Sequence, residues 1–502
     1  MTRTVLGIDA STTAIKAIAF DADGVPVATG RSSLQRQSPH PGWAEQSAED
    51  WWQGLVAAIR DVIGQLESAG AGMPEAVCIT HQRETFVCLD EDGQQVRPAI
   101  LWLDTRAGTQ IERFGDAAVH ATSGKPPSTT PSLYKLIWLR ENEPLTLERT
   151  AMVLDVGGYL AYRLTGEHVT STASADPLSI LDMAAFDWSP ELLGLIGLPA
   201  ESYPRLVPPG QVMATVDAGA SASTGLPEGT PVVAGAGDGQ AAGLGAAVLD
   251  DDRAYLSLGT SITLGLHSTE FRTSMSYRTL ASPLAGSYTL EGLLASGALS
   301  LEWVRGAIAK LADTPDGNAA LSALAGSSTP GSRGLLFLPY LTSAETPYWD
   351  ADARGAFVGL GEYHTTADLV RATFEGLALE VRLLLELILA DTGTDPGRLI
   401  VMGGAARSAV FLQILADVLE RDIEVSSEDE TAALGAAVLA AFAVGLHGRA
   451  DLAATAARMT RTTATFRPQA DSSATYSRLF AVYRLLYPQL KGVFASLGEF
   501  RR

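Results

Sequence analysis

Two short polar turns carry residue types that bind phosphate. The first is Asp9-Ala10-Ser11-Thr12-Thr13 and the second is Gly259-Thr260-Ser261, and each separates two apolar runs. A tight turn between strands exposes successive backbone N–H groups as an anion-binding nest, and flanking hydroxyls add further donors. Either turn alone could be an ordinary hairpin. Two such turns facing each other would hold a polyphosphate from both sides, with Lys16 as a cation and Asp9 as a ligand for hydrated Mg²⁺.

A single aspartate, Asp238, lies among glycines directly after the apolar run Pro231-Val232-Val233-Ala234. The glycines leave room for a ligand, and a carboxylate there can accept the proton of a hydroxyl whose oxygen attacks phosphorus. The same aspartate could instead cap the helix that follows it. Gln82-Arg83-Glu84 follows the strand-like run Ala76–Thr80. Its cation and carboxylate could bind a polyol, or they could form a solvated ion pair.

The paired glycines Gly403-Gly404 stand between the strand-like run Leu399–Met402 and a helical pattern that begins after Ser408. A flat ligand could approach the bare backbone there, although a tight turn would use the same residues. Two other phosphate-binding patterns are absent. Gly124-Lys125 lacks the earlier glycine of a P-loop, and the glycines around Asp238 lack the acidic residue expected about twenty residues after a dinucleotide-binding fingerprint.

Hydrophobic periodicity predicts the elements that position these residues. The chain opens with two apolar runs and an Asp23-Gly24 turn, which predicts a three-stranded meander. Trp51–Leu66 places its apolar residues on one helical face, and Ser47-Ala48-Glu49-Asp50 before it has the form of a capping box. The pattern of apolar strand, Gly/Ser/Thr turn and apolar strand returns at Ala254–Leu266. The sequence therefore predicts an internal repeat.

This repeat divides the 502 residues into two expected domains, 1–248 and 249–502. Hydrophobic residues make up 46% of the chain, which is typical of globular proteins. The net charge of −21 excludes a broad basic surface for nucleic acid or anionic membranes. The longest uncharged run, Thr431–Leu446, is shorter than the roughly 20 residues of a membrane-spanning helix, so we expect a buried helix.

The two cysteines, Cys78 and Cys88, lie in apolar runs, which indicates a reducing compartment rather than a zinc site. The N-terminus enters a strand-like run without the apolar block of a secretory signal. We therefore expect a cytoplasmic protein that acts on small molecules.

Taken in order, the motifs resemble those of the FGGY family of carbohydrate kinases, part of the actin/hexokinase/Hsp70 ATPase superfamily. The similarity extends over nearly the whole chain through Asp9–Thr13, His40–Glu45, Gln82–Thr85, Gly237-Asp238, Gly259–Ser261, Pro347–Asp350, Gly403–Ala405 and Glu430–Ala436. The resemblance implies an α/β fold of two ribonuclease-H-like domains. ATP and Mg²⁺ would lie in a central cleft with a sugar or polyol deeper in, and a homodimer is possible.

The resemblance also implies a role for each matching position. Asp238 would be the catalytic base, and Asp9 would bind the metal. The substrate would contact Gln82, Arg83, Glu84, Asp104, Asp238 and Gln240. The nucleotide would contact Ser11, Thr12, Thr13, Lys16, Gly259, Thr260, Ser261, Glu302, Gly403, Gly404 and Ser408.

The motifs point to two different acceptors. Gln82–Thr85 and Pro347–Asp350 are similar to glycerol kinases, whereas Leu256–Ser261 is similar to xylulokinases. Thr130 stands near the position of the substrate tyrosine of glycerol kinases, and Gly239 replaces the amide residue usual after the catalytic aspartate. Both positions carry a smaller residue than usual, which leaves space in the pocket and favours a larger acceptor.

The expected reaction is therefore ATP-dependent phosphorylation of a terminal hydroxyl on a small sugar or polyol. A ketopentose such as D-xylulose is the first choice, and glycerol, a tetritol or a pentitol is the alternative. A non-catalytic ATP-binding regulator of the actin/Hsp70 type is an alternative of another class. Such a regulator needs no buried acid beside a polyol pocket. The presence of Asp238 together with Arg83 and Glu84 therefore favours the kinase over the regulator.

Overall fold

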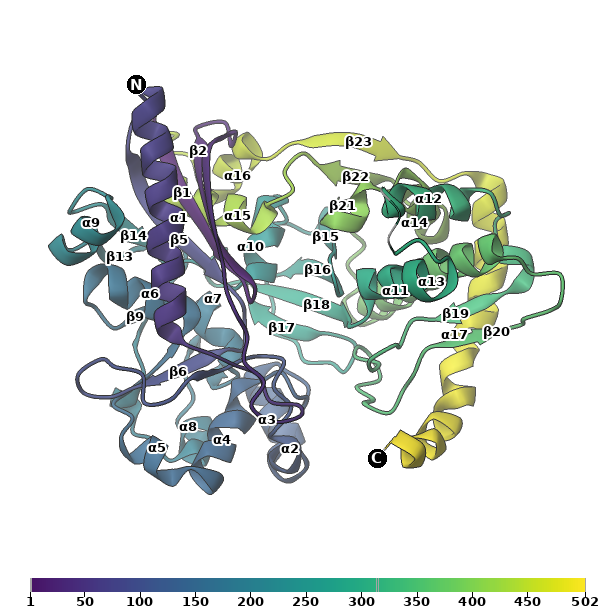
Figure 1. Ribbon diagram of the computed structural model, residues 1–502, viewed down its shortest axis with the longest axis horizontal. Coiled ribbons are helices and arrows are strands. Elements are labelled where there is room, and N and C mark those ends of the chain that lie inside the picture. The colour runs from purple at the N-terminus through teal and green to yellow at the C-terminus, as the bar shows by residue number, and fades with distance from the viewer. Residues whose placement is uncertain (1, 313, 315, 502) are drawn as a thin grey trace.

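The computed structural model describes residues 2–312, 314 and 316–501, and its first half is built on a six-stranded mixed sheet (Figure 1). The strand order in this sheet is β13-β14-β5-β1-β2-β3. The strands are β1 (Thr4–Ala10), β2 (Ala14–Asp21), β3 (Pro26–Ser33), β5 (Pro74–His81), β13 (Val212–Thr215) and β14 (Pro231–Val233). Strand β1 runs antiparallel to β2 and parallel to β5, so the predicted opening meander is confirmed.

The second half contains a seven-stranded sheet with the order β17-β18-β16-β15-β21-β22-β23. Its strands are β15 (Arg253–Leu258), β16 (Ile262–Ser268), β17 (Arg278–Ala281), β18 (Tyr288–Leu294), β21 (Arg398–Met402), β22 (Ile423–Ser426) and β23 (Thr462–Phe466). Strand β15 is antiparallel to β16 and parallel to β21, as β1 is to β2 and β5. The two sheets therefore repeat one strand pattern, as the sequence predicts.

Two helices rich in small residues pack between the sheets. They are α10 (Asp238–Gly245) and α15 (Thr431–Ala443), which contact each other. Helix α15 also contacts β1, and α10 contacts β15. Figure 1 shows α15 beside β1 and β2, although it belongs to the second half of the chain. A Cβ atom on Gly435 would lie 1.9 Å from the carbonyl oxygen of Ala241, so this close approach requires glycine. The division of the chain at residue 248 stays a prediction.

Further helices cover the outer faces and carry the remaining core. They are α1 (Ala48–Ala69), α4 (Ser132–Asn142), α6 (Val156–Thr165), α11 (Gly297–Trp303), α12 (Gly317–Gly326), α13 (Thr366–Thr392), α14 (Ala409–Leu419) and α17 (Ala470–Gly498). The apolar face predicted for α1 is buried. The predicted capping box is wrong, because the amide of Gln95 accepts the Ala48 N–H and donates to the Ser47 hydroxyl. Of the helices in the described residues, none combines the length and hydrophobicity of a membrane span.

A buried carboxyl group in α13 gives the stability of the fold a pH dependence. Glu380 is fully buried and accepts hydrogen bonds from the hydroxyls of Tyr340 (2.8 Å) and Tyr483 (2.6 Å). Burial raises the pKa of Glu380 to about 7, while the two hydrogen bonds act in the opposite direction. The folded chain therefore holds this proton over a pH range in which the unfolded chain, with a pKa near 4.5, releases it.

We expect the free energy of unfolding to fall as pH rises from about 4.5 to 7, because only the unfolded state gains by losing this proton. The slope from this group reaches about 1.4 kcal/mol per pH unit and vanishes above pH 7. Urea unfolding at several pH values would measure it. The variant Glu380→Gln should lack this component, and identical slopes for the two proteins would contradict the assignment.

Candidate active site

Asp9 lies near the end of β1, directly opposite Lys16 of β2. The Lys16 ammonium group is paired with Glu430, 2.5 Å away at the start of α15. Among the described residues, the buried Oδ1 of Asp9 has no hydrogen-bond partner. Burial raises the pKa of Asp9 to about 7, and the charge of Asp238 acts in the same direction while Lys16 opposes it. Two neighbouring carboxylates repel each other when both are ionised, and a cation bound beside them would relieve this repulsion.

The predicted phosphate turn between β1 and β2 lies against the segment after β5. Ser11 closes the turn, donating its N–H and hydroxyl to the carbonyl of Ala14 at 3.0 and 2.9 Å. The Thr12 hydroxyl donates to Oε1 of Gln82 (2.9 Å) and accepts from the Trp102 indole N–H (3.0 Å). The next residue, Thr13, is exposed. The turn and the Gln82 segment therefore form one hydrogen-bonded unit.

Asp238 is the first helical residue of α10, and Gly237 is the N-cap, so the capping alternative for Asp238 is wrong. Oδ1 of Asp238 is 3.0 Å from Nε of Arg83 and accepts the Gly239 N–H at 2.7 Å. The Asp238 side chain is 41% exposed, whereas that of Arg83 is 10% exposed. Within the described chain, Oδ2 of Asp238 has no hydrogen-bond partner and can therefore meet a ligand.

Arg83 and Glu84 do not pair with each other, so the alternative of a solvated ion pair is wrong. Glu84 is buried, the side chain of Arg83 is 10% exposed, and both contact charges from the second half of the chain. Arg83 Nη1 lies 3.1 Å from Oε2 of Glu291 on β18. Glu84 Oε1 accepts a 2.9 Å hydrogen bond from Nη1 of Arg278 on β17. Arg278 also binds Glu291, through Nε at 2.8 Å. Sequence reasoning missed both partners.

The space expected at Gly239 is occupied, and Thr130 contacts a predicted substrate residue. The Thr130 hydroxyl donates to Oε1 of Glu84 at 2.9 Å. A Cβ atom on Gly239 would lie 2.9 Å from Nη2 of Arg83 and 2.9 Å from Oε2 of Glu291. Gly239 therefore makes room for the arginine side chain rather than for a ligand. The argument from these two positions to a larger acceptor is not supported.

Two predicted substrate residues are held by the protein itself. The carboxylate of Asp104 is fully buried and accepts hydrogen bonds from the Ala44 N–H and the guanidinium of Arg106. Its oxygens therefore fix a turn and are not available to a substrate. The Gln240 side chain is buried, and its Nε2 donates to the carbonyls of Ala173 (3.0 Å) and Ala281 (3.3 Å). Gln240 thus joins the two halves through its Nε2, while its buried Oε1 has no hydrogen-bond partner among the described residues.

The predicted nucleotide residues of the second half surround a cavity of about 950 Å³. The five that line it are Gly259, Thr260, Glu302, Gly404 and Ser408. A Cβ atom on Gly404 would meet no atom within 4 Å, so this glycine faces open space. Gly403 differs, because its φ is 93° and its Cβ would lie 2.9 Å from the Leu258 carbonyl oxygen. Gly403 and Ser261 adjoin the cavity without lining it.

Helix α12 also lines this cavity, which the sequence did not indicate. Its Asn318 and Ser322 face the cavity, and the Ser322 hydroxyl lies 2.8 Å from that of Ser408. Ser408 caps α14 by accepting the Phe411 N–H at 3.2 Å. Small polar residues on a short helix carry no distinguishing pattern, so only the fold identifies them.

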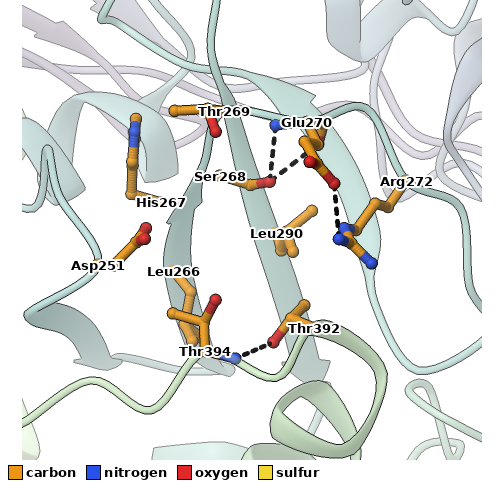
Figure 2. Close-up of a pocket in the computed structure, with 10 residues that line it drawn as sticks. All are labelled: Asp251, Leu266, His267, Ser268, Thr269, Glu270, Arg272, Leu290, Thr392 and Thr394. Carbon is orange, nitrogen blue, oxygen red and sulfur yellow. Dashed lines mark hydrogen bonds and ion pairs between the residues drawn. The ribbon is translucent and has the colours of Figure 1, made fainter.

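A smaller cavity of about 160 Å³ lies at the C-terminal end of strand β16 in the second sheet (Figure 2). It is formed by β16, β18, the turn before β15 and the loop after α13. Two of its charged residues, Glu270 and Arg272, bind each other at 2.6 Å, and Asp251 is a third. None of the predicted site residues belongs to this cavity.

Comparison with known proteins shows similarity along both halves. Residues 4–245 match the N-terminal domain, and residues 254–444 the C-terminal domain, of the FGGY family of carbohydrate kinases. The xylulose kinase of Bacillus subtilis is 29% identical over 506 residues, covering 99% of each chain. The glycerol kinase of Beutenbergia cavernae is 31% identical over 475 residues, covering 89% of this chain and 91% of its own. The crystal structure of xylulose kinase from Rhodospirillum rubrum superposes with a TM-score of 0.91 at 29% identity, covering 98% of this chain and 100% of that one.

Proposed function

The chain belongs to the FGGY family of carbohydrate kinases, and we propose that it transfers the terminal phosphoryl group of ATP to a terminal hydroxyl of a small sugar or polyol. The predicted family and its two-domain α/β fold are confirmed. Members of the family are ATP-dependent phosphotransferases, so the protein is an enzyme of this class.

The position of Asp238 is the observation that carries the proposal. Its carboxylate contacts Arg83 on one side and acts electrostatically on Asp9 on the other. In this position Asp238 can take the proton from the substrate hydroxyl while the oxygen of that hydroxyl attacks the phosphoryl group. Arg83 would bind the polyol, and Asp9 would bind the metal. In this proposal Arg83 and Glu84 orient the acceptor, and the Thr12 and Thr260 turns bind phosphate oxygens.

Asp9 would hold Mg²⁺ together with phosphate oxygens and water. Its buried, unpartnered Oδ1 and the neighbouring carboxylate of Asp238 are a donor set that this ion favours. Across the described residues, no three His, Cys, Asp or Glu side chains cluster as a complete metal site. Mg²⁺ retains several waters, so one or two carboxylates are sufficient. When bound, the ion would neutralise charge on the phosphates.

Gly404 provides a test of the proposed nucleotide cavity. The variant Gly404→Leu should raise the KM for ATP at least tenfold, because the leucine side chain would enter open space within the cavity. The KM for the acceptor should change less than about threefold. Steady-state kinetics with each substrate varied in turn would measure both values.

The variant Gly492→Leu is a matched control, since Gly492 is exposed on α17 and its Cβ would also meet no atom within 4 Å. It should leave both KM values unchanged. An unaltered ATP KM in Gly404→Leu would exclude the nucleotide from this part of the cavity.

We propose a ketopentose such as D-xylulose as the acceptor, on the basis of similarity to proteins named xylulose kinase. Glycerol is the second candidate, because a protein named glycerol kinase is 31% identical and the Arg83–Glu84 pair resembles that group. ADP release should be measured with pentuloses, tetritols, pentitols, glycerol and hexuloses. Greatest stimulation by a pentulose would support the first choice, and stimulation by none would favour a non-catalytic ATP-binding regulator.

The remaining expectations concern the protein's surroundings. Cytoplasmic location and a homodimer stay predictions, as does the absence of nucleic-acid and membrane partners.

A further inference from the structure

A reciprocal pair of ion pairs joins the two halves of the chain beneath the proposed acceptor site. The arginine of each half contacts a glutamate of the other: Arg83 with Glu291, and Arg278 with Glu84. All four side chains are at least 90% buried. Because buried charges are stable only when paired and hydrogen-bonded, this arrangement fixes all four side chains relative to one another.

The contacts engage every nitrogen of the Arg278 guanidinium and both oxygens of Glu291. Arg278 directs Nη1 to Glu84 and both Nε and Nη2 to Oε1 of Glu291. Oε2 of Glu291 binds Arg83 and the Tyr255 hydroxyl, the latter at 2.9 Å. Both oxygens of Glu291 are therefore engaged, and all three nitrogens of Arg278 are directed at a glutamate. Holding Arg83 and Glu84 in place is the role that these contacts support, which makes Arg278 and Glu291 positioning residues.

Glu84 keeps one oxygen for a ligand. Its Oε1 accepts from both Arg278 and Thr130 at 2.9 Å, while Oε2 has no hydrogen bond within the described residues and is not sealed from solvent. The φ of Glu84 is 57°, in the left-handed region that non-glycine residues rarely adopt. Strained backbone and a doubly anchored Oε1 together determine where Oε2 lies.

The charge around this oxygen selects against an anionic acceptor. Two arginines, Arg83 and Arg278, face the three carboxylates of Glu84, Glu291 and Asp238. A fourth carboxyl group, that of Glu345, interacts electrostatically with both Arg278 and Glu84. Two buried lysines also act electrostatically on Glu84. Lys125 is paired with Asp176, and Lys135 donates to the carbonyls of Trp102 (2.9 Å) and Thr130 (2.8 Å). The carboxylate of a sugar acid would therefore find every one of these cations already partnered, whereas hydroxyl groups of a neutral polyol can donate to the carboxylate oxygens.

We propose that Arg278 is a specificity-determining positioning residue, which anchors Oε1 of Glu84 so that Oε2 accepts a hydroxyl of an uncharged sugar or polyol. This inference rests on the proposed kinase function. In this role Arg278 acts only through Glu84, and its loss should affect recognition of the acceptor rather than of ATP.

A double-mutant cycle tests this dependence. The variant Arg278→Met should raise the KM for the best neutral acceptor about 10- to 100-fold, with the ATP KM within about threefold. In a Glu84→Ala background, which removes both oxygens, the same change should alter the acceptor KM less than about threefold. Equal effects in both backgrounds would overturn the proposal. Should Arg278→Met fail to fold, Arg278→Lys, which retains the charge but fewer donors, takes its place in the cycle.

Arg398→Met is the control for loss of an ion pair in the same sheet, since Arg398 binds Glu424 twice at 2.7 Å between β21 and β22. It should leave both KM values unchanged. The wild type should also use D-xylulose at least 100-fold better, in kcat/KM, than the five-carbon acid D-xylonate. Comparable use of the acid would overturn the charge argument. A wild type that phosphorylates no acceptor would overturn the kinase proposal itself, and this inference with it.

Discussion

Replacing Asp238 with asparagine is expected to lower kcat about 10²- to 10⁴-fold, the usual contribution of a positioned general base. Asparagine has nearly the same shape and can still accept from Arg83 and Gly239, but it cannot take a proton at Oδ2. The dissociation constant for ATP should stay within a few-fold, because the large cavity does not include Asp238. Acceptor-dependent ADP release and calorimetric ATP binding would measure the two quantities.

Asp217→Asn is the matched control. Asp217 caps α9 (Ala218–Thr224) and accepts the Ala220 N–H at 2.7 Å, so it is also a carboxylate at a helix start. This variant should keep full turnover. If Asp238→Asn retained most of its rate, another group would have to accept the proton, and the proposed role of Asp238 would be wrong.

Motifs at strand ends were predictable because they are contiguous in the sequence. Asp9, Gln82 and Asp238 each lie at or just after a strand of one sheet, and local patterns located all three strands. Parallel strands β1, β5 and β14 end at the same edge, so their following residues converge. The repeat of strand, turn and strand was also predictable, because each copy is contiguous in the sequence.

The partners of these residues were not predictable, because they are distant in sequence and have no motif. Arg278 lies 194 residues from Glu84, and Glu291 lies 208 residues from Arg83. Hydrophobic periodicity shows which residues face a core, but it does not show which charged side chains form ion pairs with each other. The error at Gly239 has the same origin, since a glycine leaves equal room for a ligand or for a neighbouring side chain.

The close packing that places Asp238 gives the second large effect, which concerns stability. Gly435→Ala should lower the free energy of unfolding by about 1–3 kcal/mol or more, as expected for overpacking. Its new methyl carbon would lie 1.9 Å from the Ala241 carbonyl oxygen, a backbone atom that moves only if α10 moves. Asp238 begins α10, so kcat should fall as well. Urea unfolding midpoints and acceptor-dependent ADP release would measure both effects.

Gly64→Ala is the control, because the same glycine-to-alanine change should stabilise the protein at this position. Gly64 lies in α1, is exposed, and has nothing within 4 Å of its Cβ position. Alanine there should stabilise the protein by about 0.5–1 kcal/mol through helix propensity alone, with kcat unchanged. A Gly435→Ala protein as stable and active as the wild type would mean that α10 and α15 can separate freely. Asp238 would then owe its position to Arg83 rather than to the packing of the two helices.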